Sequence, residues 1–270
     1  MRPRLFLHVL SIEARKSMSY RLDFWIQAVV GFAIGVAAPY FLWAAMFAES
    51  GSRTIGGFTL RGMVLYYVAV TLLARLVRGP DLVVDVANDI YEGGLNRYLV
   101  FPTGYVSFKY AQHLGVAFPF LIQLAIFGTA TVAFVGDLDA IGITAGSATM
   151  AVASIAVANL LFFLLAYPVQ AVAFWADNVW SLVVLLRFAT ALFGGAMLPL
   201  TLFPEAMQRV LFYSPFPCLF HLPVSALLGR VSPAEWAEGI AVGVFWCAVF
   251  AAVGRLVWRR GELSYSGVGM

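Results

Sequence analysis

Long apolar stretches dominate the pattern of hydrophobic and polar positions along the chain. A helix needs about 20 mostly apolar residues to cross the hydrocarbon core of a bilayer. Six stretches approach or exceed this length, and we expect each of them to form a membrane-spanning helix. The predicted spans are Phe24–Phe47, Gly62–Val77, Leu114–Val135, Ala140–Trp175, Val179–Phe203 and Ile240–Val257.

Two of these stretches contain residues that disturb a helix. The fourth is too long for one span, and we predict a break near Tyr167 and Pro168, because proline removes a backbone hydrogen bond and clashes with the preceding turn. The fifth contains Arg187, the pair Gly194-Gly195 and Pro199. We predict that it nevertheless spans the membrane as one element.

Three segments outside the spans carry patterns of their own. In residues 1–23, apolar residues recur at helical spacing, which predicts an amphipathic helix lying in the plane of the membrane interface; a frayed basic tail is the alternative. The connections 79–109 and 204–236 are each too short for a folded domain of about 100 residues. The second is rich in proline and aromatic residues, which predicts a re-entrant helical hairpin on the external side. Residues 1–270 therefore form a single transmembrane domain.

Basic residues are distributed unevenly between the two sides of the predicted bundle. Thirteen of the 17 Lys and Arg residues fall in the two terminal segments, in the connection between the second and third spans, and near the start of the fifth span. Because basic loops stay in the cytoplasm, we predict that both termini are cytoplasmic.

Composition supports a membrane protein and excludes several chemistries. The chain is 62% hydrophobic and 11% charged, whereas soluble domains carry about 25% charged residues. The net charge of +3 gives no sign of nucleic-acid binding. Cys218 and Cys247 are far apart and resemble small hydrophobic residues, and no metal-ligand spacing is present. The sequence lacks a GxxxxGK[ST] phosphate loop, a GxSxG motif and an HExxH motif. We therefore predict no cofactor, metal or ATPase site in this chain.

Polar residues inside the spans are candidates for a substrate path. Gln27 either hydrogen-bonds between helices or touches substrate. Tyr66 could hold a flat cation or belong to the aromatic belt of the interface. Arg187 could line the path or extend to the cytoplasmic headgroups.

Two segments carry a family resemblance. One runs from Asn88 to Pro102 and reads NDIYEGGLNRYLVFP. The other is a series of short motifs: Gly195-Ala196-Met197-Leu198-Pro199-Leu200, Phe203-Pro204-Glu205, Ser214-Pro215-Phe216, Pro223 and Leu228-Gly229. In their order against six spans, and together with the terminal segments 20–24 and 265–269, they resemble the type-2 permeases of ABC exporters. Within that group the chain is similar to the viologen-exporter branch.

The resemblance implies a cytoplasmic coupling helix that docks onto a separate ATPase subunit. The matching positions are Glu92, Gly93, Gly94, Leu95, Arg97, Leu99 and Pro102. Asn96 stands where an Asp is expected, and Phe101 where a basic residue often precedes the proline. The residues agree with a docking role, since Gly93-Gly94 can break a helix and Leu95 and Leu99, at i and i+4, could form an apolar knob for a partner's groove. A polar loop on the membrane surface is the alternative.

The resemblance also implies a function and a set of partners. The chain would be the permease subunit of an ATP-driven exporter in the bacterial cytoplasmic (inner) membrane, with two ATPase subunits that bind ATP and Mg and with a second permease, identical or homologous. Its substrate would be a hydrophobic or cationic small molecule, as in multidrug efflux, or a lipid or peptide. The alternatives are a self-sufficient secondary transporter, an intramembrane enzyme or a non-transporting scaffold subunit. Secondary transporters and intramembrane enzymes need buried acids or a catalytic set within the spans, and we see neither.

Overall fold

The computed structural model describes residues 2–79, 85–99, 103–135 and 143–265, and these ranges are helical almost throughout. They contain no strand, only an isolated bridge between Ile55 and Phe58. The predicted all-helical class is confirmed. The elements are α1 (Pro3–Ser17), α2 (Arg21–Ser50), α3 (Leu60–Arg78), α4 (Asp85–Tyr91), α5 (Leu95–Leu99), α6 (Tyr105–Ala117), α7 (Phe120–Val135), α8 (Ala145–Ala171), η2 (Val172–Phe174), α9 (Trp180–Phe193), η3 (Leu200–Leu202), α10 (Glu205–Phe212), α11 (His221–Leu227) and α12 (Pro233–Ser264).

Five helical segments of the described chain are long and apolar enough to cross a membrane. They are Arg21–Ser50, Leu60–Arg78, Tyr105–Phe134, Ala145–Phe174 and Pro233–Ser264. The chain is therefore a multi-pass membrane protein. The fifth predicted span, Val179–Phe203, contains α9, which has only 14 residues. At a rise of 1.5 Å per residue α9 is only about 21 Å long, short of the hydrocarbon thickness of about 30 Å.

The prediction of one continuous span over Val179–Phe203 is wrong, because the helix stops at the two glycines. Gly195 has a φ of +88°, in the left-handed region that favours glycine. A Cβ on Gly194 would lie 2.9 Å from a ring atom of Phe220, so the chain passes too close to α11 for a larger residue. The carbonyls freed at this helix end accept hydrogen bonds from α3: Tyr66 donates to Gly195 at 2.7 Å and Tyr67 to Met197 at 2.9 Å.

The prolines in the middle of the chain do not affect the helices as predicted. The predicted break near Tyr167 and Pro168 is wrong, since α8 continues to Ala171 and then tightens into η2. The third span instead begins at Tyr105, within the predicted connection 79–109, and is interrupted at Phe118 and Pro119 between α6 and α7. Pro39 and Pro168 thus remain inside α2 and α8, whereas Pro119 marks a break.

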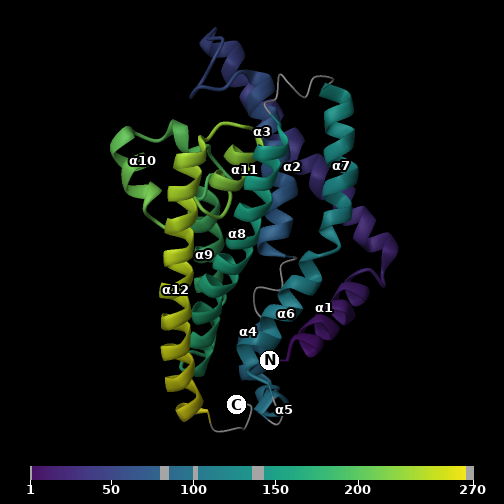
Figure 1. Ribbon diagram of the computed structural model, residues 1–270, viewed down its shortest axis with the longest axis vertical. Coiled ribbons are helices and arrows are strands. Elements are labelled where there is room, and N and C mark those ends of the chain that lie inside the picture. The colour runs from purple at the N-terminus through teal and green to yellow at the C-terminus, as the bar shows by residue number, and fades with distance from the viewer. Residues whose placement is uncertain (1, 80–84, 100–102, 136–142, 266–270) are drawn as a thin grey trace.

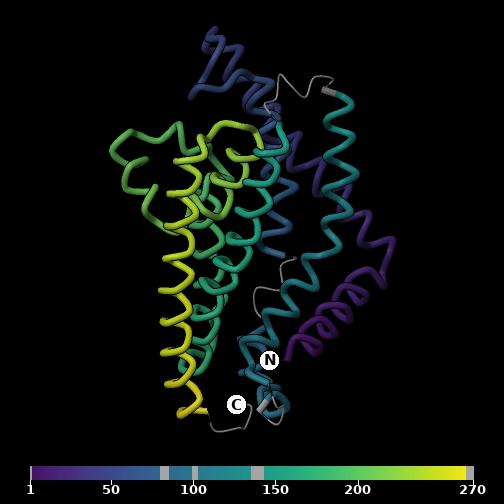
Figure 2. The backbone as a smooth tube through the Cα atoms, in the orientation of Figure 1, coloured from purple at the N-terminus to yellow at the C-terminus, as the bar shows by residue number. Residues whose placement is uncertain are grey.

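Helices α8 and α12 lie side by side and form the main body together with α9, as Figures 1 and 2 show. Helix α11 packs into one end of this body, against α8 and α3, and α2 packs against α3. Helix α7 stands apart from α8 and contacts α3 (Figure 1). The start of α1 and the end of α12 lie at the same end of the molecule as α4 and α5 (Figure 1). Which end faces the cytoplasm stays a prediction.

The two accessory regions predicted outside the spans, 1–23 and 204–236, contain helices as well. The predicted amphipathic segment 1–23 contains α1, which ends at Ser17, followed by a turn before α2. Helix α1 runs obliquely along α6 and buries Val9 and Ala14 (Figure 1). The predicted hairpin region 204–236 contains α10 and α11 and ends earlier than expected, because a capping box between Ser232 and Glu235 starts α12 at Pro233. Placement of either region relative to a membrane stays a prediction.

Candidate functional site

The segment that carries the family resemblance folds into two short helices, α4 and α5, separated by a glycine turn. Gly93 has a φ of +68° directly after α4, which is the position where a left-handed glycine commonly ends a helix. The prediction that the two glycines break a helix is confirmed. Of the predicted coupling residues, Glu92 and Arg97 are exposed and Leu95 is buried. The side chain of Leu99, and Pro102 as a whole, lie outside the described residues.

The interpretation of Leu95 as a knob for a partner is wrong in this structure. Its side chain is fully buried, in a cluster with Val86, Ile90 and Tyr98. Tyr98 is buried beside it, so the apolar side of α5 faces the subunit itself. The surface left open to a partner carries polar side chains, those of Glu92, Asn96 and Arg97.

A single buried carboxylate joins α4 and α5 to the start of α6. Asp89 lies 2.6 Å from the ammonium of Lys109 through Oδ2 and 3.1 Å from the guanidinium of Arg97 through Oδ1. Tyr105 donates a further hydrogen bond to Oδ2 at 2.8 Å. The Asp89 and Lys109 side chains are each only 8% exposed, and the cation of Lys109 also lies 5.2 Å from the ring centre of Tyr98. Such charge-assisted hydrogen bonds are short and directional, so they fix the relative position of the three helices.

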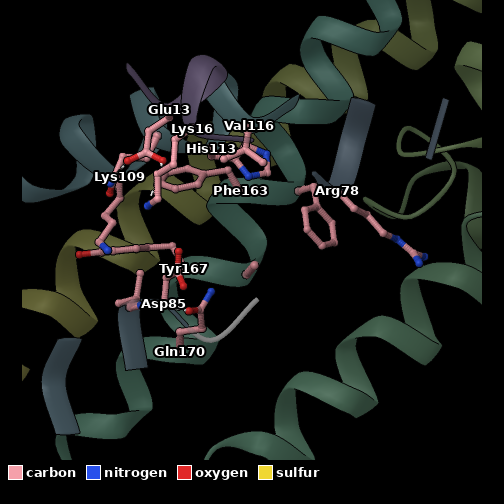
Figure 3. Close-up of a pocket in the computed structure, with 14 residues that line it drawn as sticks. Glu13, Lys16, Arg78, Asp85, Lys109, His113, Val116, Phe163, Tyr167 and Gln170 are labelled. Atoms are coloured by element: carbon pink, nitrogen blue, oxygen red, sulfur yellow. Dashed lines mark hydrogen bonds and ion pairs between the residues drawn. The ribbon is translucent and has the colours of Figure 1, made fainter. Parts of the chain in front are cut away.

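A polar cavity of about 180 Å³ lies beside this carboxylate cluster, between α1, α4, α6 and α8 (Figure 3). One wall comes from α1, α4 and α6, and the other from α8. The polar side chains of the first wall are Glu13, Lys16, Asp85, Lys109, Gln112 and His113, and those of the α8 wall are Tyr167 and Gln170. Arg78 also borders the cavity, but its guanidinium points away from it in Figure 3 and lies over the ring of Phe220, at 4.6 Å from the ring centre.

Hydrogen bonds satisfy only part of this polar lining. Gln112 donates to Glu13 at 2.9 Å, and Gln170 accepts from the backbone nitrogen of Val86 at 3.0 Å. The Oε1 of Gln112 and the hydroxyl of Tyr167 are buried and have no partner among the described residues.

Burial affects the ionisation of Asp85, an acid that lines the cavity. Desolvation raises the pKa of its carboxyl, and the charge of Lys109 offsets only part of that effect. The nearby carboxylate of Asp89 raises the pKa of Asp85 further.

The three predicted substrate-path residues lie on three different helices. Gln27 of α2 is exposed. Its side-chain amide donates to Asp23 at 2.8 Å, and its backbone carbonyl accepts from the guanidinium of Arg75 at 2.8 Å. Tyr66 of α3 is fully buried, with its hydroxyl bound to Gly195. Arg187 lies half-buried in the middle of α9. None of the three lines the polar cavity, and their role in a substrate path stays a prediction.

Reasoning from the sequence did not single out the residues that organise this site. In the sequence, Asp89 belongs to the segment from Asn88 to Pro102, and Lys109 is one of the basic residues of the predicted cytoplasmic connection. The signal available was Lys109 itself, a lysine flanked by aromatic residues a few positions before an apolar span. The acids Glu13 and Asp85 carried no comparable signal.

The fold and this site can be compared with known proteins. The sequence model of one family, described as ABC-2 family transporter protein, matches residues 33–269, which is most of the chain. The chain belongs to the ABC-2 transporter family. This family supplies membrane components of ABC transporters, which typically have no ATPase site of their own and associate with an ABC ATPase.

The match to the ABC-2 family includes α4, α5 and α6 and leaves α1 outside it. No curated protein and no solved structure matches this ABC-2 transporter chain. Membership in the viologen-exporter branch stays a prediction.

Proposed function

We propose that this chain is the permease subunit of an ATP-driven exporter and takes its energy from a separate ATPase. The observation that carries the proposal is the family match together with the α4–α5 segment, whose inner side is anchored in the subunit and whose outer side is polar and exposed. The sequence has no phosphate loop, so the energy must arrive through a protein contact.

The exposed side of the α4–α5 segment is the proposed docking surface for the ATPase. It carries Glu92, Asn96 and Arg97, whereas Leu95 anchors the segment from within. Polar and charged contacts of this kind set partner choice and on-rate and depend on salt. Docking through a polar surface replaces the apolar knob as the physical basis of the contact.

A complete transporter in this proposal has two permeases and two ATPases that bind ATP and Mg. Gln27, Tyr66 and Arg187 lie on three different helices, α2, α3 and α9. The substrate path in this proposal runs between two permeases, with α2 and α9 near the seam. The second permease is identical or homologous. The cargo is a hydrophobic or cationic small molecule, a lipid or a peptide, and export proceeds from the cytoplasm of a bacterium across its inner membrane.

Co-purification of the ATPase tests the docking surface. We expect Asn96→Trp, a bulky change on the exposed side of α5, to weaken ATPase binding by about tenfold or more, for which about 1.4 kcal/mol suffices. Ser52→Trp, on the exposed connection between α2 and α3, is the matched control and should leave binding unchanged. Unchanged binding of Asn96→Trp would remove the α4–α5 segment from the interface. Transport by the chain without any ATPase would identify a secondary transporter instead.

A further inference from the structure

We propose that Asp89 is a positioning residue that makes α1, α4, α5 and α6 move as one body when the ATPase changes shape. The proposal rests on the proposed function, because it concerns how motion leaves the docking surface. Its starting point is the carboxylate cluster, in which Asp89 on α4 holds Arg97 on α5 and both Tyr105 and Lys109 on α6.

The carboxylate cluster is costly as a device for stability alone. Two charges must leave water to form the pair of Asp89 and Lys109, and well-packed apolar residues often serve stability as well or better. What the ion pair provides instead is a fixed geometry, because each oxygen of the carboxylate has a defined partner at 2.6 to 3.1 Å. The exposed docking side of α5 therefore cannot shift without α6.

Helix α1 belongs to the same body through its contact with α6. A Cβ on Gly115 would lie 2.6 Å from the backbone oxygen of Leu10, so the two helices approach at backbone distance. The hydrogen bond from Gln112 to Glu13 adds a polar link at 2.9 Å. The body includes both the docking surface and the predicted interfacial helix.

The polar cavity marks the seam between this body and the rest of the subunit. Its far wall comes entirely from α8, and the Oε1 of Gln112 and the hydroxyl of Tyr167 have no partner among the described residues. The seam is crossed by the stacked rings of Tyr105 and Trp258, at 4.5 Å between ring centres. It is also crossed by the hydrogen bond that the backbone nitrogen of Val86 donates to Gln170 at 3.0 Å. The break at Phe118 and Pro119 lets α6 change direction relative to α7. A displacement of the docking surface should therefore change the cavity.

Labelling of the cavity in the complete complex tests the proposal. Ala166→Cys places a thiol on the α8 wall, and a membrane-impermeant maleimide reports access to it with and without ATP and vanadate. In the otherwise unmodified complex we expect the labelling rate to change on nucleotide binding by about fivefold or more, the lower end of typical couplings between two sites. With Asp89→Asn added, the ATPase should still co-purify while the nucleotide-dependent change disappears.

Two further variants keep the test decisive. Asp177→Asn, an exposed acid at the same end of the subunit, is the control and should respond like the unmodified complex. Asp89→Asn combined with Lys109→Gln leaves no unpaired buried charge, so it should fold even if the single variant does not, and it should also lose the response. A retained response in this double variant would overturn the proposal, as would loss of ATPase binding in it, because Asp89 would then act on docking itself. Absence of ATPase binding in the unmodified chain would instead refute the proposed function.

Discussion

The crossing of α1 over α6 offers a sharp test of the fold at the N-terminal end. Gly115 lies at this crossing, and a Cβ added to it would meet the backbone oxygen of Leu10 at 2.6 Å, its Cα at 3.1 Å and the Cβ of Glu13 at 2.8 Å. These atoms belong to the backbone of α1 or to the root of a side chain, so no rotamer change relieves the clash. Gly115→Ala therefore forces α1 away from α6.

The magnitude follows from comparison with a second glycine. Overpacking of this kind costs about 1–3 kcal/mol, whereas Gly→Ala in an unobstructed helix interior gains up to about 1 kcal/mol. Gly128 in α7 is unobstructed, with no atom within 4 Å of a Cβ, so Gly128→Ala shows the gain alone. The unfolding free energies of the two variants should differ by about 1–3 kcal/mol.

Thermal unfolding in one detergent compares the two variants directly. A second measurement follows α1 alone: Val9, 7% exposed, becomes a cysteine, and its reaction with a maleimide should speed up in Gly115→Ala but not in Gly128→Ala. If the two variants unfold at the same temperature and the cysteine stays equally protected, α1 does not pack on α6 through its backbone.

Three further outcomes are expected. Leu95→Ala should lower the unfolding midpoint of the permease without any ATPase present, because truncating a fully buried leucine costs about 2–5 kcal/mol, and an unchanged midpoint would return Leu95 to the partner interface. The raised pKa of Asp85 means that the folded state binds the proton of this carboxyl more tightly than the unfolded state does. The contribution of Asp85 to the free energy of unfolding is therefore fully present at low pH and is lost as pH rises through that pKa. Thermal scans at several pH values should show a smaller fall in the unfolding midpoint for Asp85→Asn, and an identical profile would contradict the burial of this acid. An impermeant thiol reagent added to intact cells should label a cysteine at Ser52 and spare one at Glu92, and the reverse pattern would invert the predicted topology.

The long spans could be predicted because length and apolar composition are local properties. The fate of a proline could not, since Pro39 and Pro168 remain inside α2 and α8 while Pro119 marks a break. Apolar spacing along a helix also predicts that one face of the helix is buried, but it does not identify the surface that covers this face. Leu95 illustrates this, because its burying partner is the subunit itself.

The organising charges of the site depended on contacts that one sequence does not reveal. Asp89 and Lys109 are separated by 20 positions and lie on different helices, and both fall in the predicted cytoplasmic connection 79–109. A charge in such a segment is normally exposed, and the packing of α4, α5 and α6 around it removes this pair from water.

The end of α9 is fixed by residues that lie about 130 positions earlier in the chain. Tyr66 and Tyr67 supply the donors for the carbonyls of Gly195 and Met197, and a buried backbone carbonyl without a donor is expensive. If α9 lengthened, unwound or slid along α3, those carbonyls would lose their donors. This part of the subunit therefore has little capacity to absorb a displacement locally, and a movement that reaches α3 should carry the end of α9 with it.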